Sequence, residues 1–324
     1  QTMMIKNDPK MNRNTNNIPV NVYNSKLLEE IGQIHHIFTD KTGTLTSNIM
    51  HFRSLSVRGT VFSPPEQKYT VKLTENVKFY SEEFKDILNG QPSELQLEIR
   101  RTLLVLSLCH SVFLDKKGTY HSSSQDEITF VKFCKLYGYE FKGSSEEDSK
   151  LLTLAIDGKY HKYRLLEEVA FTAERKRMST IVSDENGKIY LLTKGADTEI
   201  LRRLHKDEDK NVIDKLVLDT KNFSLHGLRT LMLGYREISM EEYNQWKQKY
   251  EQNLQNDQIR EELINELEGN LTLLGVTGVE DELQPELEET LQFMMGAGIV
   301  IWVLTGDKTE TAMNTAYSAG LIPD

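Results

Sequence analysis

The sequence predicts an α/β protein in which both ends of the chain build one parallel sheet and a second, α+β domain is inserted between them. Two apolar segments, 34–38 and 299–304, have the length of strands, and each ends in a loop rich in Thr, Gly and Asp. Between them lies a long segment with hairpin signals. Because site-forming loops follow the carboxyl ends of parallel strands, we expect the two apolar segments to lie in the same sheet.

The other elements follow from periodicity and from turn residues. Residues 1–25 show no periodicity and indicate an irregular lead-in, followed by a short helical turn at 27–32. The dipeptides Asp157-Gly158 and Asn186-Gly187 each predict a hairpin. The expected strands outside the parallel sheet are short ones within 51–74, then 152–156, 160–166, 178–182, 188–192, 228–235 and 271–279. The expected helices are 95–108, 126–137, 196–204, 212–226, a charged pair within 240–267, 286–295 and 309–319.

Composition excludes several classes of protein. The 324 residues include 39 Lys and Arg against 49 Asp and Glu, a net charge of −10 that argues against a nucleic-acid partner. Two cysteines, Cys109 and Cys134, form neither a disulfide framework nor a four-ligand zinc site, and we expect buried free thiols. No apolar run reaches the ~20 residues that span a bilayer. Composition alone therefore indicates a soluble, intracellular chain of about two domains.

The loop after the first apolar strand carries the clearest chemistry. It reads Asp40-Lys41-Thr42-Gly43-Thr44, followed by Leu45 and Thr46. An aspartate at the end of a buried parallel strand is placed to attack a phosphoryl group and to carry it as an aspartyl phosphate. Lys41 would neutralise the transferring group, and the hydroxyl and backbone N–H groups of 42–44 would bind its oxygens. Thr42 stands where a phosphatase would need an acid or base, which favours a longer-lived phosphoenzyme.

The loop after the second apolar strand reads Thr305-Gly306-Asp307. Parallel pairing of the two strands would bring its hydroxyl, amide and carboxylate beside Asp40. Alone, this tripeptide is a weak signal because many such sequences are simple turns. Together with the first loop, it predicts a second wall for a phosphate site.

The inserted segment holds residues suited to a nucleotide. Such a pocket needs an aromatic face for the base, a hydrogen-bonding group for its edge and cations for the phosphates. Phe171, Glu127, Lys194 and Arg229 supply these types of group. Each has a plain structural alternative, since Phe171 is equally suited to a core. The prediction depends on their occurring together.

The three motifs DKTGTLT, KGAD and TGDK, in this order, resemble those of a P-type ATPase. Further motifs resemble the phospholipid-flippase subclass: T-x-N-x-M-x-F from Thr46 to Phe52, Leu108-Cys109-His110, Phe171 ahead of RKRMS, LRTL from Leu228 to Leu231, and VEDELQ from Val279 to Gln284. The resemblance covers about residues 20 to 320, the large cytoplasmic loop of such a protein. It implies a HAD-like (Rossmann-type) phosphorylation domain, incomplete at the C-terminus, with an inserted α+β nucleotide-binding domain built on an antiparallel sheet.

The resemblance also implies roles and boundaries. Residues 1–25 would be a connector from a membrane helix, 26–53 with 276–324 the phosphorylation domain, and 54–275 the nucleotide-binding domain, with hinges near 47–54 and 269–278. Asp40 would be the phosphorylated nucleophile, and Asp40 and the Thr42 carbonyl would hold Mg²⁺. The phosphate site would be completed by Lys41, Thr305, Gly306 and Asp307. The residues implied in ATP binding are Glu127, Phe171, Ser179, Lys194, Gly195, Arg229 and Asp281. Departures from the family pattern at Gln125 and Glu282 bear on nucleotide affinity.

The implied function is ATP-driven phosphorylation of Asp40 with Mg²⁺, coupled in a multi-pass parent to phospholipid translocation. This places the chain on the cytoplasmic face of a membrane, with ATP as ligand, lipid contacted only through membrane helices outside the chain, and room for an accessory membrane subunit. The chain ends before any G-D-G-x-N-D segment, so we expect it to bind ATP but not to turn over. The alternatives are a nucleotide-sensing regulatory module, a cation-pump-type P-type ATPase and a soluble phosphatase.

Overall fold

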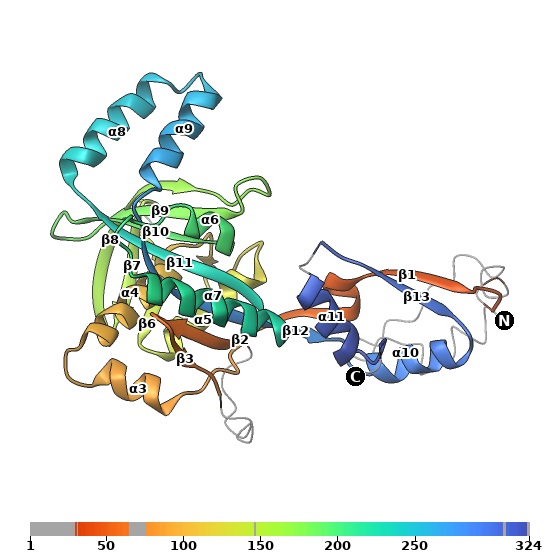
Figure 1. The fold of residues 1–324 in the computed structure, drawn as a ribbon. Helices are drawn as coiled ribbons and strands as arrows, with labels where there is room; N and C mark the ends of the chain where they lie inside the picture. The colour runs from red at the N-terminus through yellow and green to blue at the C-terminus, as the bar shows by residue number, and fades with distance from the viewer. Residues whose placement is uncertain (1–29, 31, 65–75, 146, 307–308, 323–324) are drawn as a thin grey trace. The chain divides into compact units, whose positions relative to one another are not determined.

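The computed structural model describes residues 30, 32–64, 76–145, 147–306 and 309–322, in two units (Figure 1). One unit contains the described residues up to Leu45 together with 284–306 and 316–322. The other contains 46–283 and 309–315. The expected connector 1–25, most of the expected turn at 27–32, part of the expected strands within 51–74, and Asp307 lie outside the described residues.

The first unit contains the predicted parallel pair. Strand β1 (His36–Asp40) runs parallel to β13 (Val300–Leu304), with Asp40 opposite Leu304. Helix α10 (Leu287–Gly296) belongs to the same unit. The strands are not buried as predicted, because Phe38 is 65% exposed and stacks on the exposed Trp302 ring. Among the described residues, no third strand joins this sheet and no layer covers that face.

The second unit is built on a nine-stranded sheet of order β3-β2-β12-β11-β10-β9-β8-β7-β6, in which all neighbours are antiparallel. Its strands are β2 (Thr46–Val57), β3 (Thr60–Phe62), β6 (Tyr139–Ser144), β7 (Leu151–Ile156), β8 (Lys159–Val169), β9 (Arg177–Ser183), β10 (Ile189–Gly195), β11 (Arg229–Ile238) and β12 (Thr272–Leu283). A small ribbon is formed by β4 (Phe113–Leu114) with β5 (Tyr120–His121). The antiparallel sheet that the sequence predicts for the inserted domain is confirmed.

Both hairpin predictions are confirmed. Asp157 and Gly158 have φ of +49° and +79° at the β7–β8 turn, the left-handed geometry that matches strand twist. At the β9–β10 turn, Gly187 has φ of +79°, and the Asp184 backbone N–H donates a hydrogen bond of 2.9 Å to the Lys188 carbonyl. Strands β8 and β10 both run further than predicted, to Val169 and Gly195.

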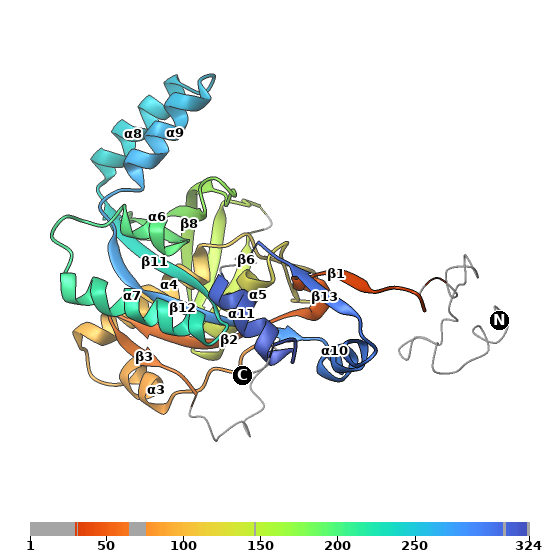
Figure 2. The same cartoon turned by 45° about the vertical axis from the view of Figure 1, so that its right-hand side comes forward.

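Helices cover both faces of this sheet. The helices of the second unit are α3 (Glu82–Asn89), α4 (Glu94–Leu108), α5 (Gln125–Leu136), α6 (Asp197–Leu201), α7 (Lys210–Leu225), α8 (Met240–Gln252) and α9 (Asp257–Leu267). Leu233 packs in a core with α3, α4 and α5, whereas its neighbour Met232 packs with α6 and α7 on the other face. Helices α8 and α9 form a hairpin that stands away from the sheet (Figure 2) and bury Trp246 at its base. The last helix, α11, spans Thr309–Ser318.

The two units divide the chain between Leu45 and Thr46 and between Leu283 and Gln284. The predicted domains divide it at 53/54 and 275/276. Strands β2 and β12 pair from Thr46 with Leu283 onward, so residues 46–53 and 276–283 lie in the nine-stranded sheet. The predicted hinge segments 47–54 and 269–278 lie within or next to these strands. The strands extend further because side chains of β2 such as Met50 and Phe52 are buried in the second unit's core. Assigning the units to phosphorylation and nucleotide binding stays a prediction.

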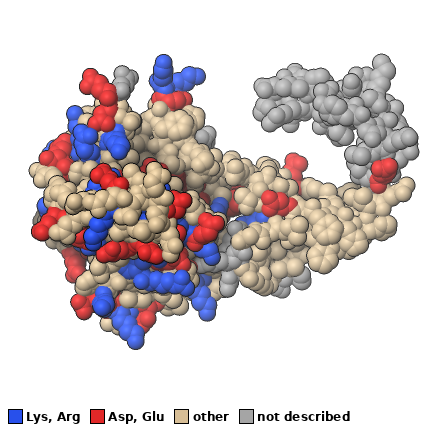
Figure 3. Space-filling view, turned by 90° about the horizontal axis from the view of Figure 1, so that it is seen from above, with Lys and Arg blue, Asp and Glu red and all other residues tan. Residues whose placement is uncertain are grey.

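Within the described part of the chain, no helix has the length and apolar composition needed to cross a bilayer. Both cysteines are buried and free, as predicted, and burial raises the pKa of each thiol. Lysines and arginines alternate with acidic residues over the face of the second unit seen in Figure 3.

Candidate functional site

Asp40 ends β1, and its carboxylate is exposed. One oxygen, Oδ1, accepts a hydrogen bond of 2.7 Å from the backbone N–H of Lys41. The chain then turns sharply, with Gly43 at φ +77°, a left-handed conformation that glycine adopts without strain. Thr42 and Thr44 are exposed beside it. The Lys41 side chain is only 1% exposed, so it is buried and not on the surface with the carboxylate.

The parallel register brings the second predicted loop to the same sheet edge. Because Asp40 pairs with Leu304, Thr305 and Gly306 follow directly beside the Asp40 loop. Asp307, the carboxylate of that loop, lies outside the described residues. Among the residues that are described, no three His, Cys, Asp or Glu side chains cluster as a metal site would.

The second unit holds a cavity of about 400 Å³ on one face of its sheet. Side chains alternate along a strand, and cross-strand partners share a face. Lys194 on β10 is opposite Met178 on β9 and Leu233 on β11, and Arg229 lies on the Leu233 side of β11. The cavity is lined by Ser111, Ser123, Ser124, Asp126, Glu127, Phe130, Glu168, Ala170, Phe171, Met178, Lys194, Gly195, Arg229 and Leu231.

A buried ion pair forms the floor of this cavity. The Lys194 ammonium lies 2.7 Å from Glu127 Oε1, donates to the Cys109 carbonyl and sits 5.7 Å from the centre of the Phe130 ring. Glu127 Oε2 accepts from the Ser111 backbone N–H at 2.9 Å and from the Ser111 hydroxyl at 2.7 Å. Burial alone raises the pKa of Glu127, but Lys194 and the Ser111 donors outweigh burial and hold it at about 2. Glu127 is therefore an ionised anchor for Lys194.

The rim of the cavity differs from its floor. Phe171 follows the end of β8, and its ring is 60% exposed, so a face is available to a ligand. Arg229, at the start of β11, lies 3.5 Å from Asp126 and is partly exposed. In the sheet, β8 and β11 are separated by three strand spacings, which is about 14 Å. The cavity thus offers an aromatic face near one end and a guanidinium near the other.

Five of the residues implied in ATP binding line this cavity: Glu127, Phe171, Lys194, Gly195 and Arg229. Ser179 does not. It alternates with Met178 on β9, so its hydroxyl points to the opposite face and bonds Glu268 and Thr193. Asp281 lies on β12 opposite Met50 and is not among the lining residues.

Sequence reasoning missed Ser111 and Glu168, which also line the cavity. Glu168 lies on β8 beyond the predicted end of that strand at 166. Partial burial, together with the nearby Glu127 carboxylate, raises its pKa. Met178 was detectable, because its alternation with Ser179 follows from the predicted strand. Ser111 carries no sequence signal, because its role depends on the turn that follows α4.

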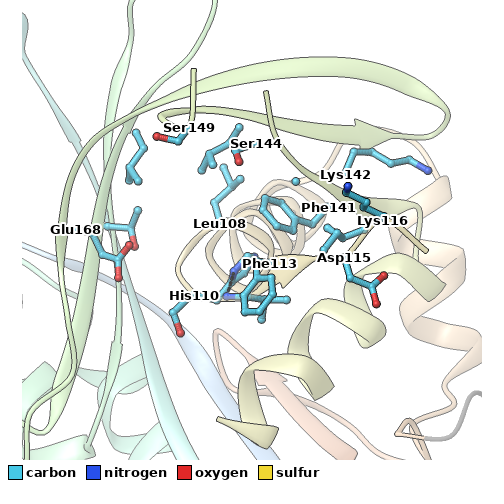
Figure 4. Close-up of a pocket in the computed structure, with 17 residues that line it drawn as sticks. Leu108, His110, Phe113, Asp115, Lys116, Phe141, Lys142, Ser144, Ser149 and Glu168 are labelled. Atoms are coloured by element: carbon cyan, nitrogen blue, oxygen red, sulfur yellow. Dashed lines mark hydrogen bonds between the residues drawn. The ribbon is translucent and has the colours of Figure 1, made fainter. Parts of the chain in front are cut away.

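A second cavity, of about 460 Å³, adjoins the first and shares Ser111 and Glu168 with it. Figure 4 shows Glu168 on one wall and Phe113, His110 and Phe141 on the other. The His110 ring packs edge-on against Phe141 at 4.6 Å between centroids. Its Nδ1 accepts from the Val112 backbone N–H at 3.1 Å, and its Nε2 is 2.7 Å from the Ser107 carbonyl. These partners suit a neutral imidazole.

Comparisons with known proteins agree on one family. The model of the P-type ATPase cytoplasmic domain N matches residues 98–286. Phospholipid-transporting ATPase DRS2 of Saccharomyces cerevisiae is 37% identical over 100% of this chain and 25% of its own length. Phospholipid-transporting ATPase IK of Mus musculus is 33% identical over 95% of this chain and 24% of its own length.

Phospholipid-transporting ATPase IC of Homo sapiens is 33% identical over 94% of this chain and 26% of its own length. The chain therefore spans about a quarter of the length of the curated relatives it matches. Since the family model covers more than half of the chain, including all the strands and turns that line the cavity, this chain belongs to the P-type ATPase family and carries its cytoplasmic domain N.

Proposed function

We propose that this chain is the ATP-binding and phosphorylation region of a P-type ATPase that transports phospholipid. The observation that carries the proposal is the cavity in which Glu127, Phe171, Lys194 and Arg229 converge from separate elements of the second unit. The names of its relatives support the phospholipid-transporting class over a cation pump.

ATP fits the two ends of the cavity. The adenine ring would stack on the exposed face of Phe171, and base–aromatic stacking contributes about 1–3 kcal/mol. Arg229 would bind the phosphates some three strands away, about 14 Å across the sheet. Lys194 of β10, fixed by Glu127, would present a positive charge between them, one strand from Arg229.

After ATP has bound, its γ-phosphoryl group would be transferred to Asp40. An Asp40 carboxylate oxygen attacks phosphorus, the bond from phosphorus to the bridging oxygen of ADP breaks, and ADP leaves with that electron pair. An exposed carboxylate at the carboxyl end of β1 is open to such an in-line approach. The adjoining hydroxyl and backbone N–H groups of 42–44 and 305–306 would bind the phosphoryl oxygens.

The donors around Asp40 fit Mg²⁺ in the manner usual for phosphoryl transfer. Mg²⁺ is commonly held by one or two carboxylates, waters and the substrate's own phosphates. The Asp40 carboxylate and the Thr42 carbonyl, both on the exposed turn, would supply the protein ligands. When bound, Mg²⁺ neutralises charge on the transferring phosphate.

In the whole protein, hydrolysis of the aspartyl phosphate would drive movement of a phospholipid across the bilayer. Lipid would be bound by the membrane helices of the whole protein. The proposed location is the cytoplasmic face of that membrane, with an accessory membrane subunit as a further partner.

Nucleotide binding by the 324-residue chain tests the first part. Titration with ATP, followed by calorimetry, should show saturable binding that Phe171→Ala weakens roughly tenfold or more. Phe113→Ala is the matched control, because its ring is also 60% exposed but lines only the neighbouring cavity. Equal affinity of the two variants would contradict the assignment of Phe171 to the base.

Phosphorylation tests the second part in a protein of the relatives' full length. Radiolabelled ATP should give an acid-stable, hydroxylamine-sensitive phosphoenzyme that Asp40→Asn abolishes while ATP affinity is kept. Binding without any phosphoenzyme in the unaltered protein would favour the nucleotide-sensing module instead.

A further inference from the structure

A buried carboxylate, that of Glu268, lies on the sheet face opposite the nucleotide cavity. Glu268 is 1% exposed and ends α9, at the base of the α8–α9 hairpin. Its Oε2 accepts from Arg177 Nε at 2.8 Å, and its Oε1 accepts from the Arg175 guanidinium and the Ser179 hydroxyl. All three donors belong to the segment that follows Phe171, although 89 or more positions separate them from Glu268.

The Arg175 guanidinium that Glu268 holds also closes the Phe171 loop. Its Nη1 donates to the Ala170 carbonyl at 3.2 Å, and its backbone N–H donates to the Thr172 hydroxyl at 3.2 Å. The Lys176 N–H donates to the Thr172 carbonyl at 2.8 Å. Arg175 therefore bridges Glu268 to the residue that immediately precedes Phe171.

The same segment contacts the end of β10, the strand that carries Lys194. The Ala196 N–H donates to the Lys176 carbonyl at 2.9 Å. A Cβ built on Gly195 would lie 2.5 Å from the Arg177 Cβ, so the two backbones approach as closely as glycine permits. A shift of the Arg175–Arg177 segment would thus reach both Phe171 and Gly195.

Glu268 itself does not line the cavity, because Arg177 and Ser179 point away from the Met178 face of β9. Any effect on a nucleotide must pass through the loop. Removing its charge would leave two poorly exposed guanidinium groups facing each other, although Arg177 keeps contacts with Asn265 and Glu199. Among the described residues, Arg175 has no other carboxylate partner, so its end of the loop would be released first.

We propose that Glu268 is a positioning residue for the nucleotide site: it fixes the 170–176 loop so that the Phe171 ring faces the base. This inference rests on the proposed ATP-binding function of the cavity. On this proposal, Glu268, at the base of the α8–α9 hairpin, controls the affinity of the cavity for the nucleotide.

Glu268→Gln in the 324-residue chain tests the proposal, because glutamine keeps the size and removes the charge. ATP affinity by calorimetry should fall roughly tenfold, within the range of a lost aromatic stack. Glu266→Gln is the matched control: it makes the same change two residues earlier, in α9, at an exposed side chain that makes no ion pair among the described residues. The control should leave the affinity unchanged.

A merely structural role is separated by repeating both measurements in a Phe171→Ala background. If Glu268 acts through Phe171, the Glu268→Gln change no longer alters ATP affinity there, but it still lowers the melting temperature. An equal loss of affinity in both backgrounds would overturn the proposal. Should Glu268→Gln fail to fold, Arg175→Lys replaces it, since this change leaves the Arg177–Glu268 pair intact and removes only the fork that reaches Ala170.

The outcomes separate this inference from the proposed function. No ATP binding by the unaltered chain would refute the function itself. ATP binding that Phe171→Ala weakens but folded Glu268→Gln and Arg175→Lys leave unchanged would refute only the positioning role.

Discussion

The buried His110 ring makes the stability of the second unit sensitive to mild acid. Burial, together with the positive charge of Lys194, lowers its pKa from 6.5 to about 4. Protonation would also turn Nδ1 into a donor and break its bond from the Val112 N–H. Since the folded pKa lies below the unfolded one, the unfolded chain binds the proton more readily. Stability is therefore present above about pH 6.5 and is lost as pH falls from there to about 4.

The size of the loss follows from the same two pKa values. Between about pH 7.5 and about pH 5.0, the unfolded imidazole becomes almost fully protonated and the folded one about one-tenth protonated. The difference corresponds to a loss of roughly 2 kcal/mol in the free energy of unfolding. Carboxylates whose pKa is lowered, such as Glu127, add little there, because their unfolded values lie near 4.5 and below. Glu168, with a raised pKa, acts in the opposite direction.

Urea unfolding followed by tryptophan fluorescence measures this loss of stability, provided that the fluorescence reports on the second unit alone. The chain has two tryptophans, so a Trp302→Phe background leaves Trp246, buried in the second unit, as the only reporter. In that background, His110→Gln should shrink the acid-induced loss by roughly 2 kcal/mol, since an amide donates and accepts without titrating. His205→Gln, at an exposed imidazole, is the control. Equal losses with and without His110 would refute the reasoning.

Two further predictions concern the cavity floor and its edge. Lys194→Met leaves Glu127 charged and buried without its cation, so the free energy of unfolding should fall by about 3–5 kcal/mol in urea titrations. Adding Glu127→Gln should recover part of that loss, and an additive effect of the two changes would contradict the pairing. Gly195→Ala brings a methyl group within 2.7 Å of the Lys176 carbonyl, and overpacking there should cost about 1–3 kcal/mol, measured in the same way. An unchanged urea midpoint for Gly195→Ala would show that the backbone of Lys176 and Arg177 moves aside for the methyl group without cost.

What could be predicted from the sequence was mostly local. The two hairpins depend on Asp157-Gly158 and Asn186-Gly187, and such turn signals lie within a few residues. Helix α3 was missed although Ser81 caps it by accepting from the Phe84 N–H at 3.1 Å, a start signal that is present in the sequence. The long reach of β2 and β12 was missed because their pairing joins segments some 230 residues apart, and no local pattern reports such a contact.

The same limit applies to the candidate site. Phe171, Lys194 and Arg229 were identified through motifs. Only the strand order of the sheet brings them to one cavity. Ser179 was assigned with its motif, but strand alternation puts it on the other face. Glu268 gave no signal at all, because only the folded sheet brings it to the arginines.

The pairing of Thr46 with Leu283 has a consequence for how the protein is organised as a folding unit. The second unit leaves and rejoins the chain through adjacent antiparallel strands, so its two ends are already held together by the sheet's own hydrogen bonds. A segment with neighbouring ends interrupts a host domain with little loss of chain entropy, because the two host residues that it joins are close together in space. The neighbouring ends of 46–283 therefore have the geometry of a segment inserted into a host domain.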